Sequence, residues 1–460
     1  MHMVFVNRAE EISSLREWWS AAGSQLALVW GRRRVGKTAL IQEFSRDLPT
    51  VFHTGTSRPA PDELRELSRV SIPALEPGFR DVGTRPFADW QDAFETFAEA
   101  ARESPLLLVL DEFPEIQATA PEVASILRAV WDRVGGRTRL RILLCGSAVR
   151  TMEAVQEERA PLFGRFGLRL RLHPFGPHEA ALMLGGLVPG ERALVWGLLG
   201  GVPLYLEWWD QRADLRENLL RLVCRPGGRL LTEGEYLLTT EVGRSDLARR
   251  VLYSISRGRT KFNEIEQAVG TNPARVLDDL IQSRLVERLI PVTERPEKTR
   301  RKIYRLADNF LAFWLAIVDR FRSEIDRGLG NTILPVIEKD LDDHMGLRWE
   351  EAFRAHLRRR AAQGELHPEV VAVGPFWSSG RDPAEIDAVV LAGRRREAVL
   401  VGEAKWSKRV DARPILRQLE RKSEHLPRVS NEVRPCVCAL ERITYTGDAM
   451  TVTAEDIFAS

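Results

Sequence analysis

The chain has 460 residues, of which 44% are hydrophobic and 29% are charged, and its formal net charge is +2. That length exceeds one ordinary domain and predicts two to four. No apolar run approaches the ~18 residues of a membrane-spanning helix, and the opening MHMVFVNR lacks the apolar stretch of a signal peptide. The four cysteines have the spacing of neither a disulfide framework nor a zinc site. We therefore expect a soluble, cytoplasmic protein without a membrane partner, whose nucleic-acid surface, if it has one, is a local basic patch.

A phosphate-binding loop is the strongest motif. The apolar run QLALVW (Gln25–Trp30) predicts a buried strand, GRRRVGKT follows it, and ALIQEF predicts a helix. In this context glycines let backbone N–H groups close around phosphates at a helix N-terminus. The loop lysine is expected to reach the β- and γ-phosphates, and the next hydroxyl to take a Mg²⁺ position. The predicted nucleotide site contains Gly31, Gly36, Lys37, Thr38 and Ala39.

Two further apolar runs end in polar residues suited to ATP hydrolysis. LLLVL (Leu106–Leu110) precedes Asp111, placed to hold Mg²⁺, and Glu112, placed to polarise the attacking water. RILLC (Arg141–Cys145) leads to Ser147, a candidate sensor of the γ-phosphate for which a helix N-cap is the alternative. Helix-like segments separate these strands, which is typical of a parallel, three-layer α/β domain.

Six short motifs resemble the archaeal-type ATPase family, AAA+-related P-loop proteins placed near the STAND NTPases. They are FVNRAEE from Phe5, GRRRVGKT from Gly31, LLVLDEF from Leu107, LCGS from Leu144, PLFGR from Pro161 and GGVPLY from Gly200. The resemblance implies that Arg8, Glu11 and Pro203 flank the nucleotide base, although Asn7 replaces the usual glycine before that arginine. It also makes Arg165 a candidate finger on the γ-phosphate, with a surface loop arginine as the alternative.

A winged helix is predicted after a helical lid. Helices are expected at Arg244–Ser256, Phe262–Val269 and Ala274–Ser283, and strands at Leu285–Ile290 and Ile303–Leu306. Five basic residues fall within eight positions of the segment between these strands, which suits contacts to nucleic-acid phosphates. The predicted contact residues are Arg275, Arg284, Arg300, Arg301 and Lys302. A winged helix that serves only as a protein–protein spacer is the alternative.

The C-terminal segment has the element order of another fold. The expected elements are a helix (Arg348–Ala362), three strands (Val370–Phe376, Glu385–Leu391, Ala398–Trp406), a helix (Ala412–Leu426) and a strand (Arg434–Leu440). This order resembles the core of the PD-(D/E)xK nuclease fold. The resemblance assigns its motif to an acid on the first helix, to Asp387, and to Glu403-Ala404-Lys405. In such a site the carboxylates bind Mg²⁺ and the lysine orients water and offsets charge on the phosphate.

Helix periodicity selects the first of these acids. At about 100° per residue, Glu350 falls within the apolar stripe that contains Trp349 and Phe353, whereas Glu351 is expected to point away. A carboxylate on an inward stripe needs a partner, which a metal would supply. The predicted metal ligands are therefore Glu350, Asp387 and Glu403. The alternative is a nuclease fold that keeps these residues only as salt bridges.

The expected architecture is an α/β, AAA+-like P-loop NTPase core with a helical lid, a winged helix-turn-helix, and a restriction-endonuclease-like α/β domain. Its expected divisions are residues 1–175, 176–240, 241–308, 309–345 (a helical linker) and 346–460. The expected function is ATP hydrolysis with Mg²⁺ by a DNA-associated protein with a Mg²⁺-dependent nuclease site, where Mn²⁺ could substitute. The alternatives are a nucleotide-dependent switch that docks a partner protein or another copy of itself, and a DNA-binding ATPase that never cuts.

Overall fold

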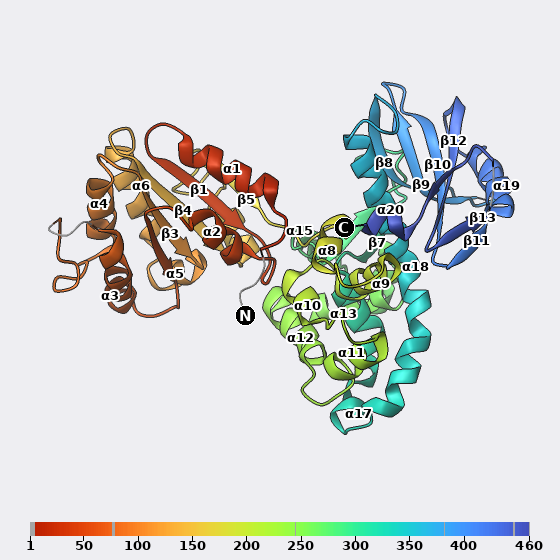
Figure 1. Cartoon of the computed structure of the whole chain (residues 1–460), viewed down its shortest axis with the longest axis horizontal. Helices are drawn as coiled ribbons and strands as arrows, with labels where there is room; N and C mark the ends of the chain where they lie inside the picture. Colours follow the sequence, from red (N-terminus) through yellow and green to blue (C-terminus); the bar gives the residue numbers. More distant parts are fainter. Residues whose placement is uncertain (1–4, 76–78, 244, 381, 445–446, 460) are drawn as a thin grey trace. The chain divides into compact units, whose positions relative to one another are not determined.

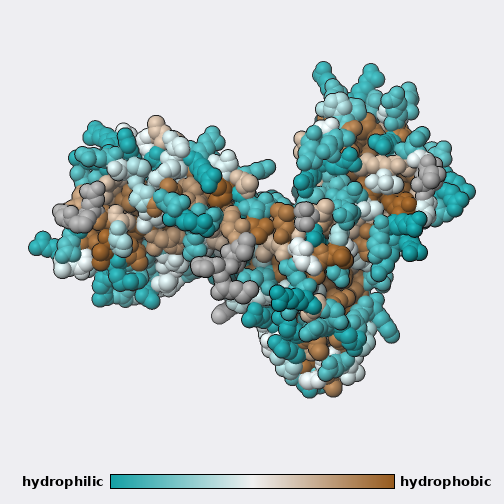
Figure 2. All heavy atoms as spheres, viewed as in Figure 1, coloured by the Kyte–Doolittle hydropathy of each residue, from teal (hydrophilic) through white to brown (hydrophobic). Residues whose placement is uncertain are grey.

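The computed structural model describes residues 5–75, 79–243, 245–380, 382–444 and 447–459. The chain forms two compact units, residues 1–173 and residues 174–460 (Figure 1). On the face drawn in Figure 2, hydrophilic side chains cover much of each unit, with smaller hydrophobic groups between them. Within the described residues, no helix has the length and apolarity needed to cross a membrane.

The first unit is built on a five-stranded parallel sheet in the order β2-β3-β4-β1-β5. Its strands are β1 (Gln25–Trp30), β2 (Thr50–Thr54), β3 (Leu106–Asp111), β4 (Leu140–Gly146) and β5 (Phe166–Arg171). The three strands expected from apolar runs are confirmed. The other two, β2 and β5, lie at the sheet edges and are only partly buried, so their sequences lack a continuous apolar run.

Helices cover both faces of this sheet, which gives the expected three layers (Figure 1). They are α1 (Ala9–Ser20), α2 (Lys37–Ser45), α3 (Ala60–Ser71), α4 (Trp90–Ala100), α5 (Phe113–Thr119), α6 (Val123–Val134) and α7 (Val149–Ala154). Neighbouring residues of β1 face opposite cores: Leu28 belongs to the same buried cluster as Phe94 of α4, whereas Val29 belongs to that of Leu40 of α2. Because β4 lies between β1 and β3, the polar ends of all three strands meet at one edge.

The second unit begins with helices and the winged helix. The helices before it are α8 (Pro177–Met183), α9 (Pro189–Leu199), α10 (Pro203–Trp208), α11 (Leu215–Leu222), α12 (Arg229–Leu237) and a π-helix (Leu238–Val242). The winged helix consists of α13 (Asp246–Ser256), α14 (Phe262–Val269), α15 (Ala274–Gln282) and the antiparallel strands β6 (Val286–Leu289) and β7 (Ile303–Leu306). All five predicted elements are present, and Arg244, expected to open the first helix, lies outside the described residues.

One long helix, α18 (Gly330–Ala362), follows α16 (Asn309–Phe313), a π-helix (Trp314–Val318), a 3-10 turn (Asp319–Phe321) and α17 (Arg322–Asp326). The prediction that this helix starts at Arg348 is wrong. The apolar side chains Leu334, Ile337 and Leu341 continue its buried stripe toward the N-terminus, so the helix has 33 residues. The expected division between residues 345 and 346 therefore falls inside a continuous helix.

The C-terminal sheet has the order β14-β12-β10-β9-β8. Its strands are β8 (Val370–Trp377), β9 (Glu385–Ala392), β10 (Glu397–Lys405), β12 (Val429–Ala439) and β14 (Met450–Val452). β8, β9 and β10 are antiparallel neighbours, and β12 runs parallel to β10 after the crossover helix α19 (Ala412–Ser423). The expected order of helix, three strands, helix and strand is thus present. Small additions are β11 (Arg409–Asp411), β13 (Arg442–Thr444) and α20 (Ala454–Phe458).

The helices α18 and α19 lie on opposite faces of this sheet. Phe353 of α18 shares a buried cluster with Leu400, whereas Leu419 of α19 shares another with Val401. The first of these clusters also contains Phe310 and residues of the winged helix and the preceding helices. The C-terminal sheet therefore shares its core with the rest of the second unit, and experiments on it need the full chain.

Three histidines of this unit, of which His356 is buried and His178 and His344 are half-buried, give a pH-dependent stability. Burial lowers the pKa of His178 to about 3, that of His356 to about 4, and that of His344 to about 3. Each ring is neutral in the folded chain, whereas the unfolded chain binds protons near pH 6.5. Stability is thus present above that pH and is lost as the pH falls toward 4. We expect the melting temperature to fall by several degrees between pH 7 and pH 5, and by less in His178→Gln, as measured by differential scanning calorimetry.

Candidate nucleotide site and carboxylate cluster

The phosphate-binding loop lies between β1 and α2, as its motif predicts. Gly36 has a φ of 91°, a left-handed conformation that favours glycine, and α2 begins at the next residue. A side chain at Gly31 would collide with the backbone of Leu172. The buried Lys37 amine donates to the carbonyl oxygens of Gly31 at 2.9 Å and Arg32 at 3.0 Å. The lysine ammonium therefore lies inside a glycine-containing loop that ends at a helix N-terminus, an arrangement that favours phosphate groups.

The acids after β3 are held beside this loop by two hydroxyl groups. The Thr38 hydroxyl donates to Asp111 Oδ2 at 3.0 Å, which brings together the two side chains expected at Mg²⁺. Ser147 donates from its hydroxyl to both oxygens of Glu112, at 2.9 and 2.8 Å, and from its backbone N–H at 3.1 Å. The N-cap position of α7 belongs to Ala148, so Ser147 orients Glu112 and does not cap a helix. This oxygen-rich set suits a hard divalent cation.

Arg8 lies against the loop from the N-terminal side. Its Nη1 donates to Glu11 at 2.9 Å, and its Nη2 donates to the carbonyl oxygens of Val35 at 3.2 Å and His173 at 2.6 Å. The preceding Asn7 has a φ of 64°, so it takes the left-handed backbone that a glycine would take more easily. Pro203, the third expected base neighbour, is the first residue of α10 in the second unit.

Arg165 is engaged elsewhere in the first unit. It forms a two-pronged ion pair with Asp132 of α6, with both N–O distances 2.9 Å, and also donates to two backbone carbonyl oxygens. Its side chain is 29% exposed. To act as a finger on a γ-phosphate, this guanidinium would first have to leave Asp132.

Asp387 and Glu403 form the centre of a second polar site on the C-terminal sheet. They lie on the neighbouring strands β9 and β10, one position from the paired residues Gly402 and Ala388. The backbone N–H of Ala404 donates to Asp387 Oδ2 at 2.8 Å, which fixes this carboxylate against β10. Glu403 is 5% exposed. The strand pairing thus brings together the two acids that the motif predicted.

Two lysines hold Glu403. Lys405 Nζ donates to its Oε1 at 2.8 Å, and Lys422 Nζ from α19 lies 3.2 Å from Oε1 and 2.9 Å from Oε2. Lys405 is 45% exposed, whereas Lys422 is only 17% exposed. Sequence reasoning missed Lys422. The element order could have indicated it. The helix that follows the Glu403 strand crosses that face of the sheet, and a lysine in its last turn can reach Glu403.

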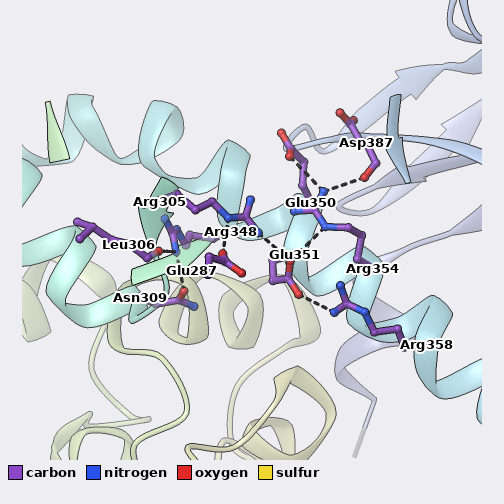
Figure 3. Close-up of polar contacts among 10 residues, drawn as sticks. All are labelled: Glu287, Arg305, Leu306, Asn309, Arg348, Glu350, Glu351, Arg354, Arg358 and Asp387. Atoms are coloured by element: carbon purple, nitrogen blue, oxygen red, sulfur yellow. Dashed lines mark hydrogen bonds and ion pairs between the residues drawn. The ribbon is translucent and has the colours of Figure 1, made fainter. Parts of the chain in front are cut away.

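The acids of α18 differ from their expected arrangement. Glu350 is half-buried and its Oε2 lies 3.4 Å from Arg354 Nη1 (Figure 3). Glu351, which was expected to point away from the apolar stripe, pairs with three arginines: Arg305, Arg354 and Arg358. The helical wheel correctly placed Glu350 and Glu351 on different faces of α18. It could not show that β7 of the winged helix packs beside the face that carries Glu351.

The acids near Asp387 repel one another. Burial, Glu350 and Glu403 together raise the pKa of Asp387 to about 7. The same burial and the same two acids raise the pKa of Glu385, which a sequence reading did not single out. A divalent cation would relieve this repulsion, so the donor set is chemically suited to Mg²⁺ or Mn²⁺. Within the described residues, however, no three His, Cys, Asp or Glu side chains stand at metal-ligand spacing, so a bound ion requires side chains to move.

Comparisons with known proteins agree with the nucleotide site. Residues 5–208 match a family described as an ATPase domain predominantly from Archaea. Residues 5–208 belong to the archaeal-type ATPase family. Residues 314–415 of this ATPase, which include Glu350, Asp387, Glu403 and Lys405, match a family described as archaeal and bacterial proteins of unknown function.

Individual relatives of the ATPase are distant. It is 25% identical over 432 residues to an uncharacterized protein of Methanocaldococcus jannaschii, with 92% of each chain covered. A stretch of 42 residues is 48% identical to an uncharacterized ATP-binding protein of the same organism, covering 9% of the ATPase and 71% of that protein. The solved Walker-type ATPase of Pyrococcus abyssi has a TM-score of 0.52 and 18% identity, covering 68% of this chain and 96% of that one. This last likeness shows the fold.

The basic residues of the winged helix are not equally available to a ligand. Arg275, Arg284 and Arg300 are exposed. Arg301 is ion-paired with Glu294, and its Nη1 donates to the carbonyl oxygen of Trp377 at the end of β8 at 3.0 Å. Its expected role as a phosphate contact thus conflicts with these bonds, which attach the wing to the C-terminal sheet. Lys302 is half-buried.

Proposed function

We propose that this archaeal-type ATPase uses Mg²⁺ and ATP, binds DNA, and cuts it at a Mg²⁺-dependent site in its C-terminal sheet. The observation that carries the nuclease proposal is the pairing of β9 with β10, which brings Asp387 and Glu403 together on one face beside Lys405. Two observations distinguish this pair from acids on the protein surface: Glu403 is buried, and a backbone N–H fixes Asp387. Buried and fixed ionisable groups of this kind are typical of functional sites.

In the first unit, the proposed roles follow from the contacts. Lys37 supplies a positive charge at the β- and γ-phosphates, and Thr38 with Asp111 holds the Mg²⁺ position. Bound Mg²⁺ would neutralise phosphate charge during transfer. Glu112 accepts a hydrogen bond from the attacking water, and Ser147 keeps its carboxylate in the required orientation. The proposed roles in hydrolysis thus belong to residues of one loop and two strand ends.

In the C-terminal sheet, Asp387 and Glu403 would bind the cation, with Glu350 as a third ligand. Such an ion, when bound, would polarise the phosphate and make a water molecule more acidic. Lys405, the more exposed lysine, is placed to orient water and to offset charge on the scissile phosphate. For the cation to reach Glu403, Lys422 must give up at least one of its two oxygens.

One observation favours a second candidate, a nuclease-like fold that docks a partner without cutting. Glu403 already has two ammonium partners, which neutralise it without a metal. The deciding experiment incubates the full chain with plasmid and linear DNA, in Mg²⁺ or Mn²⁺, with and without ATP. Cleavage that EDTA and Asp387→Asn both abolish supports the nuclease. DNA binding without cleavage under every condition supports the docking fold.

The proposed DNA contacts of the winged helix give a separate prediction. We expect Arg295→Ala, Lys298→Ala and Arg300→Ala together to weaken binding equally for all sequences. They should also reduce the log–log salt slope by about two to three units, because about one counterion is released per phosphate contact. These three side chains are exposed, whereas Arg301 is bonded to its own fold. Fluorescence anisotropy from 50 to 300 mM salt measures the slope, and an unchanged slope would assign the wing to protein docking.

A further inference from the structure

Arg354 connects two elements that present carboxylates. It lies on α18 and is 0% exposed. Its Nη1 donates to the carbonyl oxygen of Asp387 at 2.7 Å and lies 3.4 Å from Glu350 Oε2, and its Nε donates to Glu351 at 3.1 Å (Figure 3). One guanidinium therefore holds the backbone that carries one proposed cation ligand and the side chain of another.

The chain of contacts continues into the winged helix. Glu351 accepts from Arg305 of β7 at 2.8 Å and from Arg358 at 2.7 Å, and Arg305 is also paired with Glu287 of β6 (Figure 3). Through these contacts Glu351 joins the two strands of the wing hairpin to Arg354.

The bonding of Arg354 is incomplete in a way that stability alone does not explain. Within the described residues, its buried Nη2 has no hydrogen-bond partner. A buried donor without a partner loses its hydration without compensation, so such groups in native structures require an explanation. A guanidinium that must divide its bonds between Glu351 and the Asp387–Glu350 pair gives one. The guanidinium of Arg354 thus lies between Glu351, which contacts the winged helix, and the Asp387–Glu350 pair.

We infer that Arg354 is a positioning residue of the carboxylate site, and that Arg305 of the winged helix sets its orientation through Glu351. The inference rests on the proposed cation site. The carboxylate of Glu351 keeps part of the Arg354 charge away from Glu350. Without it, Arg354 turns its full charge toward Glu350, which then competes less well for a cation. The winged-helix hairpin is therefore part of the structure that prepares the cation site.

The test is a calorimetric Mn²⁺ titration of the full chain without nucleotide, counting only the binding that Glu403→Gln removes. Arg354→Lys keeps the positive charge but cannot make the three contacts of the guanidinium. Glu351→Gln keeps the shape of the side chain and removes its charge. Arg305→Lys changes only the contact that the winged-helix hairpin makes with Glu351. We expect Mn²⁺ affinity to fall roughly 10- to 100-fold in the first two, as for other groups that orient metal ligands, and less in the third. Glu365→Gln is the matched control, because Glu365 is paired with Arg360 farther along the same chain segment.

The outcomes separate the two proposals. If the wild-type chain shows no Glu403-dependent Mn²⁺ binding, the cation site itself is wrong and this inference falls with it. If the wild type binds Mn²⁺ and Arg354→Lys and Glu351→Gln bind it equally well, only the positioning role is wrong. Should Arg354→Lys fail to fold, judged by melting and ATP hydrolysis, Glu351→Gln and Arg305→Lys decide the question. A purely structural network would lower the melting temperature and leave the affinity of the folded chain unchanged.

Discussion

Glu112→Gln is expected to bind ATP normally and to hydrolyse it on the order of 10²–10⁴-fold more slowly, the usual loss when a group that activates water is removed. The amide oxygen can still accept hydrogen bonds from the hydroxyl and the N–H of Ser147, but the neutral amide cannot accept a proton from water. Steady-state phosphate release and equilibrium nucleotide binding, measured on the same preparation, separate the two effects.

Two controls make this result specific. Lys37→Ala removes the charge from the phosphate cradle and should weaken ATP binding itself. Glu115→Gln changes an acid on α5, one turn beyond Glu112, and should leave both measurements unchanged. Hydrolysis by Glu112→Gln at the wild-type rate would mean that another residue activates the water, and Asp111 would then be the first to examine.

Glu403→Gln and Asp387→Ala are each expected to abolish DNA cleavage and Mn²⁺ binding at the C-terminal sheet, while ATP hydrolysis persists. Both side chains are proposed cation ligands, and the ATPase residues belong to the other compact unit. Lys405→Ala should retain the cation and lose cleavage, because its ammonium acts on water and phosphate. Gel assays of plasmid cleavage, calorimetry and melting curves should all use the full chain, because the sheet shares its core with the winged helix.

A structural salt bridge predicts a different pattern. Breaking a buried pair leaves an uncompensated charge, which typically costs about 3–5 kcal/mol. Because Lys422 is 17% exposed and Lys405 is 45% exposed, a structural role would make Lys422→Ala the more destabilising change. The nuclease proposal would be contradicted by a wild type that binds no Mn²⁺, together with melting losses in Glu403→Gln and Lys422→Ala and none in Lys405→Ala.

Local sequence patterns predicted the elements of this protein well where burial is continuous or a motif fixes the turn. The strand Gln25–Trp30 is apolar and buried from Leu26 onward because both faces of the parallel sheet are covered, so its position follows from the local sequence. Phe262–Val269 has the predicted bounds because its apolar stripe ends at Gly270, which has a φ of 73°. The loop from Gly31 to Thr38 needs only residues that are neighbours in the chain.

Only the tertiary structure could place residues that depend on distant partners. Ser147 was a candidate sensor of the γ-phosphate, with a helix N-cap as the alternative, and only the order of β1, β4 and β3 put it against Glu112. The role of Lys422 likewise depends on α19 crossing the face that carries Glu403. A helical wheel separated Glu351 from the buried stripe of α18, but it could not show that β7 supplies Arg305 at that other face. The sequence by itself determined the strand ends and loops that carry the chemistry, since these depend on short-range periodicity and turn conformation. The pairing of strands and the packing of helices decided which charges meet, because electrostatic partners are chosen by distance in space.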